Sequence, residues 1–338
     1  MKKNMYKLIL LIIIIILVII QLLWGEKVLD SDMAAEMILA ELLHEEGKFA
    51  LTTNWYYTTE IRILYLQLVM APLFNLFSDW RIIRMLTNIA FYFAMLLSYY
   101  YMCRQLRINK KYIYLTAMGI LIPTSSMYFN IMLHGSYYAP YVVTIFIVFG
   151  LYLHSVSLMI TKKKFFVPIL LLFSIISFVS GLSGIRFLMS LYLPLSITAF
   201  IMLLKSTSMQ KCRDLFSCEN LKNMLFSQEI YYIYIAVYGT FLAGVGYLYN
   251  SFFLSGKYQL YSYEEKTFIT ITGGDLIERF QNTIGALLGC VGYIENVNII
   301  STEGILVLIV ILFIMCVVLV WKKTIALYIG DCETSSHF

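Results

Sequence analysis

Acidic residues follow shortly after the first long apolar segment of the chain. Asp30, Ser31 and Asp32 come first, and Glu36 stands one helical turn after Asp32. Residues spaced i and i+4 share one side of a helix, so Asp32 and Glu36 would face the same way. Carboxylates a few residues beyond a membrane-spanning segment lie where a lipid headgroup can reach them. A carboxylate in such a place can accept a proton in catalysis. The alternative role for these acids is to cap a helix and interact with its dipole.

A second charged pair stands at the start of the next apolar stretch, 60–77. Glu60 and Arg62 lie two residues apart, shortly after a run of aromatic residues. Charged groups at the edge of hydrocarbon need water, each other or a ligand. The pair therefore indicates either a polar ligand site or an anchor at the membrane interface.

A short turn between apolar segments contains His134, followed by Tyr137 and Tyr138. The imidazole of His134 is able to hydrogen-bond a phosphate or an acceptor hydroxyl. The alternative is an ordinary interfacial histidine in a turn that also holds glycine and proline.

A second turn, 180–186, ends in Arg186, which is the only charged residue between Lys164 and Lys205. Its small residues allow the backbone to approach a ligand closely. A guanidinium matches a phosphate bidentately, so a phosphate is a natural partner for this isolated arginine. The alternatives are that Arg186 pairs with an acid of the first loop or extends its side chain to water.

The composition shows which elements must position these groups. Of the 338 residues, 60% are hydrophobic and only 13% are charged, whereas soluble domains carry about 25% charged residues. This excludes a soluble globular protein and predicts an all-α polytopic membrane protein. Segments of about 20 apolar residues give about eight transmembrane helices, near 6–23, 82–103, 112–131, 138–160, 165–183, 187–204, 230–250 and 304–321.

Basic clusters occupy every second connection between these segments and contain most of the 25 lysines and arginines, but few of the 20 acids. By the positive-inside rule these connections face the cytoplasm. The first segment lacks a cleavage signal and is predicted to be an uncleaved anchor. We therefore expect a multi-pass protein of the plasma membrane with both termini in the cytoplasm, a large first outer loop at 24–81 and an outer segment at 251–303.

The first outer loop is expected to contain helices of its own. One begins with Asp30 or Ser31 as its N-cap and runs to about Glu46. The apolar stretches 60–77 and 284–300 are predicted to lie in the outer interface, because a span at 60–77 would move the following basic clusters outside. The face of the first loop helix that is expected to pack against the membrane or other helices contains Ala35, Ile38, Leu39 and Leu42.

This organisation resembles the GT-C-type glycosyltransferases, membrane enzymes that use polyprenyl-phosphate sugars and include protein O-mannosyltransferases and lipid A aminoarabinose transferases. The resemblance rests on the short cytoplasmic start, the single span, the acidic sequence from Asp30 to Asp32 and the interfacial helices in the same loop. It covers 1–250 as a GT-C-like transmembrane module, followed by 251–338 with an outer segment, a last span and a short cytoplasmic tail. The chain departs from the family in having Asp-Ser-Asp where many members have Asp-Glu, and in having fewer spans.

The resemblance implies sugar transfer from a polyprenyl-phosphate donor to an acceptor hydroxyl on the outer face, with inversion at the sugar carbon. Asp30 or Asp32 would take the proton of the attacking hydroxyl, while Arg186 together with His134 would stabilise the leaving phosphate. Some members hold a divalent cation with acidic residues, and Asp30 and Asp32 could bind Mg²⁺ or Mn²⁺ in that way. The supporting positions are Glu60, Arg62, Tyr137 and Tyr138.

Other function classes stay open on the sequence alone. A transporter of a lipid-linked glycan would show inverted repeats or charges within its spans; no such repeats are visible, and charges within the spans are nearly absent. A polysaccharide polymerase tends to rely on basic outer loops, whereas this first loop is rich in acids. A catalytically silent or truncated relative is a third alternative. Membrane topology explains the basic clusters, so we expect the lipid bilayer and a lipid-linked sugar as partners and no nucleic acid.

Overall fold

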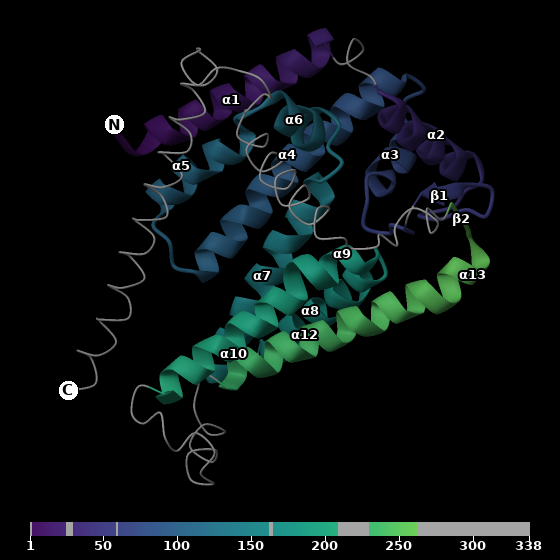
Figure 1. Cartoon of the computed structure of the whole chain (residues 1–338). Helices are drawn as coiled ribbons and strands as arrows, with labels where there is room; N and C mark the ends of the chain where they lie inside the picture. Colours follow the sequence, from purple (N-terminus) through teal and green to yellow (C-terminus); the bar gives the residue numbers. More distant parts are fainter. Residues whose placement is uncertain (1, 25–29, 59, 162–164, 209–229, 262–338) are drawn as a thin grey trace, which may run out of the picture. The chain divides into compact units, whose positions relative to one another are not determined.

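A computed structural model describes residues 2–24, 30–58, 60–161, 165–208 and 230–261 of the chain (Figure 1). Almost all of these residues lie in helices or in the turns that join them, together with one pair of short strands. The described residues belong to one compact unit, except Pro123–Asn130, which falls outside it. The predicted span at 304–321 and the predicted interfacial stretch at 284–300 lie outside the described residues.

The described residues contain five helical segments that are long and apolar enough to cross a membrane. This confirms a largely helical, membrane-embedded protein. The first three are α1 (Lys2–Trp24), α4 (Trp80–Gln105) and α7 (Ala139–Ile160). The fourth joins the short helices α9 (Ile185–Phe187) and η2 (Leu188–Tyr192) to α10 (Leu193–Ser208). The fifth is α12 (Ile230–Tyr249), extended by η3 (Asn250–Leu254) and α13 (Ser255–Lys257).

Three expected segments have different bounds. The span predicted at 112–131 is interrupted: α5 (Lys110–Leu121) ends before Pro123, and the chain resumes as α6 (Ser126–Tyr128) and η1 (Phe129–His134). Proline forces the residue before it into an extended conformation, which Ile122 adopts with a ψ of 120°. The segment predicted at 165–183 is the shorter helix α8 (Phe166–Gly181). Helical structure continues through the start of the outer segment expected at 251, as far as Lys257.

Small residues allow α8 and α12 to pack closely. A Cβ atom on Gly181 would lie 2.0 Å from the carbonyl oxygen of Ala243, and one on Gly246 would lie 2.2 Å from the carbonyl oxygen of Phe178. Any larger side chain would force the two helices apart. Such contacts are common between membrane helices, where the lipid gives little hydrophobic drive for association. These contacts hold the C-terminal end of α8 against α12, and the turn that leads to Arg186 follows directly after α8.

The segment between α1 and α4 contains α2 (Ser31–Glu45) and α3 (Gln67–Leu73). The predicted N-cap is confirmed, because Oδ1 of Asp30 accepts a hydrogen bond of 2.8 Å from the backbone N–H of Met33. The face predicted to lie on the membrane or on other helices is buried within the protein only in part, since Leu39 is buried and Ile38 is exposed. The buried face follows a different stripe and consists of Met33, Met37, Leu39, Ala40 and Leu43.

A two-stranded parallel sheet was not expected from the sequence. Strand β1 (Tyr56–Thr58) pairs with β2 (Gln259–Tyr261), with Tyr56 opposite Gln259. The stretch 60–77, expected to be one interfacial helix, is helical only over Gln67–Leu73. The residues before α3 form turns instead, and these turns bring Glu60 and Arg62 to the site described next.

Candidate functional site

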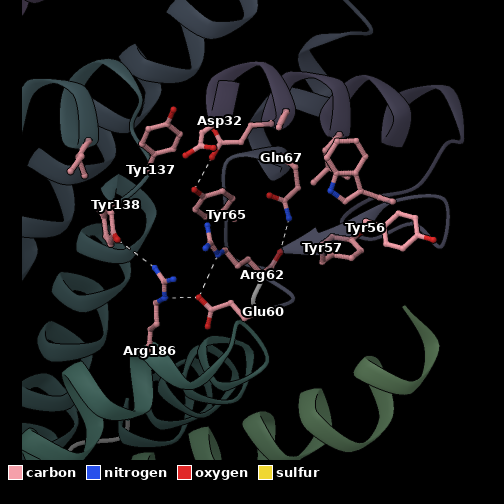
Figure 2. Close-up of a pocket in the computed structure, with 15 residues that line it drawn as sticks. Asp32, Tyr56, Tyr57, Glu60, Arg62, Tyr65, Gln67, Tyr137, Tyr138 and Arg186 are labelled. Carbon is pink, nitrogen blue, oxygen red and sulfur yellow. Dashed lines mark hydrogen bonds and ion pairs between the residues drawn. The ribbon is translucent and has the colours of Figure 1, made fainter. Parts of the chain in front are cut away.

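A cavity of about 410 Å³ lies between α2, the chain around β1, the turns before α3, the turn before α7 and the start of α9 (Figure 2). This is within the range of roughly 300–1,000 Å³ that is usual for small-molecule sites. Its wall combines acids, arginines and many aromatic rings: Asp32, Ala35, Glu36, Leu39, Trp55, Tyr56, Tyr57, Glu60, Arg62, Tyr65, Gln67, Ile131, Tyr137, Tyr138 and Arg186.

Six of the eight residues chosen from the sequence line this cavity, although they come from four separate parts of the chain. They are Asp32, Glu60, Arg62, Tyr137, Tyr138 and Arg186. The other two, Asp30 and His134, do not line it. The sequence therefore identified most of the charged residues of the wall but only two of its aromatic residues, and the structure shows that these groups share one space.

Asp30 stands beside the cavity rather than in its wall. Its Oδ1 caps α2, and the same oxygen accepts a hydrogen bond from the hydroxyl of Tyr137. Burial raises the pKa of Tyr137, and the neighbouring carboxylates raise it further. The hydroxyl therefore stays protonated and donates the hydrogen bond to Asp30. Asp32, two residues later, is exposed and lies in the first turn of α2. Of the two aspartates, Asp32 is thus the one available to a ligand in the cavity.

Arg186 forms an ion pair with Glu60. Its Nε lies 2.6 Å from Oε1 of Glu60, and a terminal guanidinium nitrogen lies 3.5 Å from the hydroxyl of Tyr138 (Figure 2). The same carboxylate oxygen lies 3.4 Å from Nε of Arg62. The alternative in which Arg186 pairs with an acid of the first loop is therefore confirmed. Two guanidinium groups share one carboxylate, which leaves this corner of the cavity with a positive charge in excess.

Gly184 allows this arrangement. Its φ of +102° lies in a region that favours glycine, and a Cβ atom there would lie 2.2 Å from Oε2 of Glu60. A side chain at this position would push the carboxylate of Glu60 away from Arg186. The small residues noticed in the turn 180–186 thus allow close approach to Glu60, a group of the protein itself.

Three residues of the site were not selected as a unit from the sequence: Glu36, Tyr65 and Arg84. Oε1 of Glu36 accepts a 2.7 Å hydrogen bond from the hydroxyl of Tyr65, and Oε2 lies 3.0 Å from a guanidinium nitrogen of Arg84. Arg84 is only 5% exposed and also donates to the carbonyl oxygen of Gly135. The spacing of Glu36 from Asp32 was the available signal, but nothing local pointed to Arg84 in an apolar helix.

Burial controls the protonation of Glu36. Removal from water raises the pKa of this carboxyl to about 7, although Arg84 and the hydroxyl of Tyr65 both favour the charged form. Tyr65 is itself protected by burial, which raises its pKa, and the adjacent Glu36 adds to that effect. Glu36 can therefore exchange a proton near neutral pH within the wall of the cavity.

His134 belongs to another cluster. It is 2% exposed, and its Nδ1 lies 3.1 Å from Oε1 of Gln21. The amide of Asn88 donates to the same Gln21 oxygen at 3.0 Å and to the backbone carbonyl of His134 at 2.8 Å. The structure does not bring this imidazole to the cavity wall together with Arg186.

The suggestion that Asp30 and Asp32 bind a divalent cation, with water and phosphate oxygens completing its shell, stays a prediction. Within the described part of the chain no three His, Cys, Asp or Glu side chains gather in a way that could hold a metal ion. One oxygen of Asp30 is already engaged by a backbone N–H and a tyrosine hydroxyl. These residues do not form a metal centre by themselves.

No protein-family model matches this chain, and neither a curated protein nor a solved structure is significantly similar to it. The assignment of function therefore depends on the cavity and its chemistry.

Proposed function

We propose that this protein is a membrane glycosyltransferase that moves a sugar from a polyprenyl-phosphate donor to an acceptor hydroxyl. The observation that carries the proposal is the joint presence of an exposed carboxylate, Asp32, and an arginine corner, Arg62 with Arg186, in one cavity. A transferase of this kind needs a proton acceptor for the attacking oxygen and positive charge for the leaving phosphate. Both are supplied here by residues distant in sequence.

Asp32 acts as the general base in this mechanism. The acceptor oxygen forms a bond to the anomeric carbon, while the bond from that carbon to the phosphate oxygen breaks and its electron pair stays with the phosphate. The proton of the acceptor hydroxyl passes to the carboxylate of Asp32. One displacement from the face opposite the phosphate inverts the configuration at the sugar carbon. Asp30 holds α2 and Tyr137 in place beside this reaction.

Arg186 and Arg62 bind the phosphate as its negative charge grows. Both guanidinium groups approach Oε1 of Glu60, and a phosphate takes over part of the role of that carboxylate. Ile185 and Met189, which flank Arg186 on the same short helices, are 38% and 55% exposed. Exposed apolar side chains next to a phosphate site suit a donor whose lipid tail stays in the bilayer.

The proposal includes a topology. About eight spans place both termini in the cytoplasm of a cell and the cavity on the outer face of its plasma membrane, where a GT-C-like enzyme meets its donor. Its support is the alternation of basic clusters along the chain and the five membrane-length helical segments.

The decisive experiment measures release of polyprenyl phosphate from polyprenyl-phosphate hexoses by the purified full chain in proteoliposomes. We expect Asp32→Asn to lower the rate at least about 100-fold, since a general base typically contributes 10²–10⁴-fold. Arg186→Lys should also lower this rate, because the ammonium group of lysine is a point charge that cannot bind a phosphate bidentately as a guanidinium does. Asp79→Asn is the matched control: Asp79 caps α4 away from the cavity, and asparagine is an equally good cap. An unchanged rate in Asp32→Asn would refute the proposal.

A further inference from the structure

The wall of the cavity opposite Arg186 is aromatic. Trp55, Tyr56 and Tyr57 line it, and Figure 2 shows Tyr56 and Tyr57 on the far side of the cavity from Arg186 and Tyr138. Tyr56 is 66% exposed, so its ring is available to a ligand. This part of the wall contains no charged side chain of its own.

The protein holds this aromatic wall in place. The hydroxyl of Tyr57 accepts a 2.9 Å hydrogen bond from the backbone N–H of Thr52, and its ring meets that of Tyr258 edge to face at 6.0 Å. Pairing of β1 with β2 fixes the backbone of Tyr56 and Tyr57. A binding surface built in advance loses less conformational entropy when a ligand arrives.

Gln67 also lines the cavity, and its side-chain oxygen is a hydrogen-bond acceptor that no donor among the described residues reaches. Its amide nitrogen donates to the carbonyl oxygens of Arg62, at 2.6 Å, and Ala50, at 3.4 Å. These two acceptors fix the orientation of the amide, so the other end must be the oxygen. The side chain is 3% exposed, and this oxygen has no hydrogen-bond partner in the protein. Figure 2 shows this oxygen on the side of Gln67 that faces Tyr65 and Asp32, across from Tyr56 and Tyr57.

We propose that this half of the cavity binds a saccharide, which makes the acceptor of the transferase a sugar hydroxyl. That the bound saccharide is the acceptor rests on the proposed function. Saccharide binding itself is argued only from the geometry of the cavity. Aromatic faces pack against the C–H faces of sugar rings, and a ring hydroxyl donates to the oxygen of Gln67. A buried acceptor left without a donor costs free energy, and a ligand hydroxyl removes that cost. A phosphate or another anion is better placed at the other end of the cavity, where the guanidinium groups of Arg62 and Arg186 lie beside Glu60.

The test is binding of the fluorescently labelled full chain, in detergent, to an array of immobilised oligosaccharides that covers neutral hexoses, hexosamines and uronic acids. Wild-type protein should bind a subset, and Trp55→Ala should bind that subset about tenfold more weakly, as expected for loss of an aromatic contact. Trp55→Phe should restore most of the affinity. Phe49→Ala is the matched control, because Phe49 is 73% exposed in the same loop but does not line the cavity.

The outcomes separate this inference from the proposed function. Binding to no glycan by a chain with normal thermal unfolding would overturn the saccharide site, as would equal binding by wild type and Trp55→Ala. Preference for serine- or threonine-containing peptides that compete at the same cavity would also overturn it. Glycan binding without release of polyprenyl phosphate would leave the site intact and refute the glycosyltransferase.

Discussion

Two polar clusters of this protein are built from similar elements but differ in charge. The cluster around Asn88 is neutral: Gln21, Asn88, Tyr92 and Ser136 are each at most 6% exposed and bond to one another or to the backbone near His134. The cluster around Glu36 is charged and borders the cavity, with Arg84 behind it. Both use residues of α4, which contributes Arg84 to one and Asn88, one helical turn later, to the other.

The difference teaches which polar residues hold the fold and which serve a ligand. A neutral network whose donors and acceptors satisfy one another stabilises helix packing and leaves nothing for a ligand to bind. A buried ion pair contributes little net free energy to stability, because the desolvation of both charges offsets most of their attraction. A role in binding or catalysis therefore explains the ion pair of Glu36 with Arg84 beside the cavity better than a contribution to stability does. Substitutions in the two clusters should separate these roles.

The largest effect is expected for Arg84→Met. Removing one partner of a buried ion pair typically costs about 3–5 kcal/mol, because the other charge is left buried and uncompensated. Unfolding in mixed micelles above pH 7, where Glu36 is charged, should show this loss. Arg81→Met is the matched control on the same helix: Arg81 pairs with Asp79 in an exposed position, and such pairs contribute about 0–1 kcal/mol. Equal losses in the two variants would contradict the assigned burial of the Glu36–Arg84 pair.

An intermediate effect is expected for Asn88→Leu. The change removes the hydrogen bonds to Gln21, Ser136 and the carbonyl of His134, and unsatisfied buried partners cost about 1–3 kcal/mol. Release of polyprenyl phosphate by the folded fraction should stay at the wild-type rate, because this cluster does not line the cavity. A folded variant without activity would show that the neutral cluster also serves the reaction.

The smallest effect concerns pH. Because burial raises the pKa of Glu36 from 4.5 to about 7, the folded state holds a proton that the unfolded state has lost in that interval. Stability from this group is complete below pH 4.5 and is lost as the pH rises through about 7. The difference in Tm between wild type and Glu36→Gln should therefore decline over that interval. Glu41→Gln, further along α2 and outside the cavity wall, is the control. A constant difference for Glu36→Gln would contradict the assigned protonation.

The helical, membrane-embedded character of the chain was determined by its sequence. Apolar stretches such as α1, α4 and α7 have only one good environment, the interior of a membrane. The cap at Asp30 was also readable, because a cap depends on residues within one turn. Glu60, Arg62 and Arg186 could be selected as site residues for the same kind of reason: charges at the ends of apolar segments require a partner.

Only the tertiary structure decided which partners these charges have. Contact between Glu36 and Arg84, or between Glu60 and Arg186, depends on how separate helices pack, and no local pattern encodes such a distance. The parallel pairing of β1 with β2 is equally non-local, since strands of three residues carry no periodic signal. His134 illustrates the same limit, because the sequence placed it in a suitable turn and helix packing buried it against Gln21.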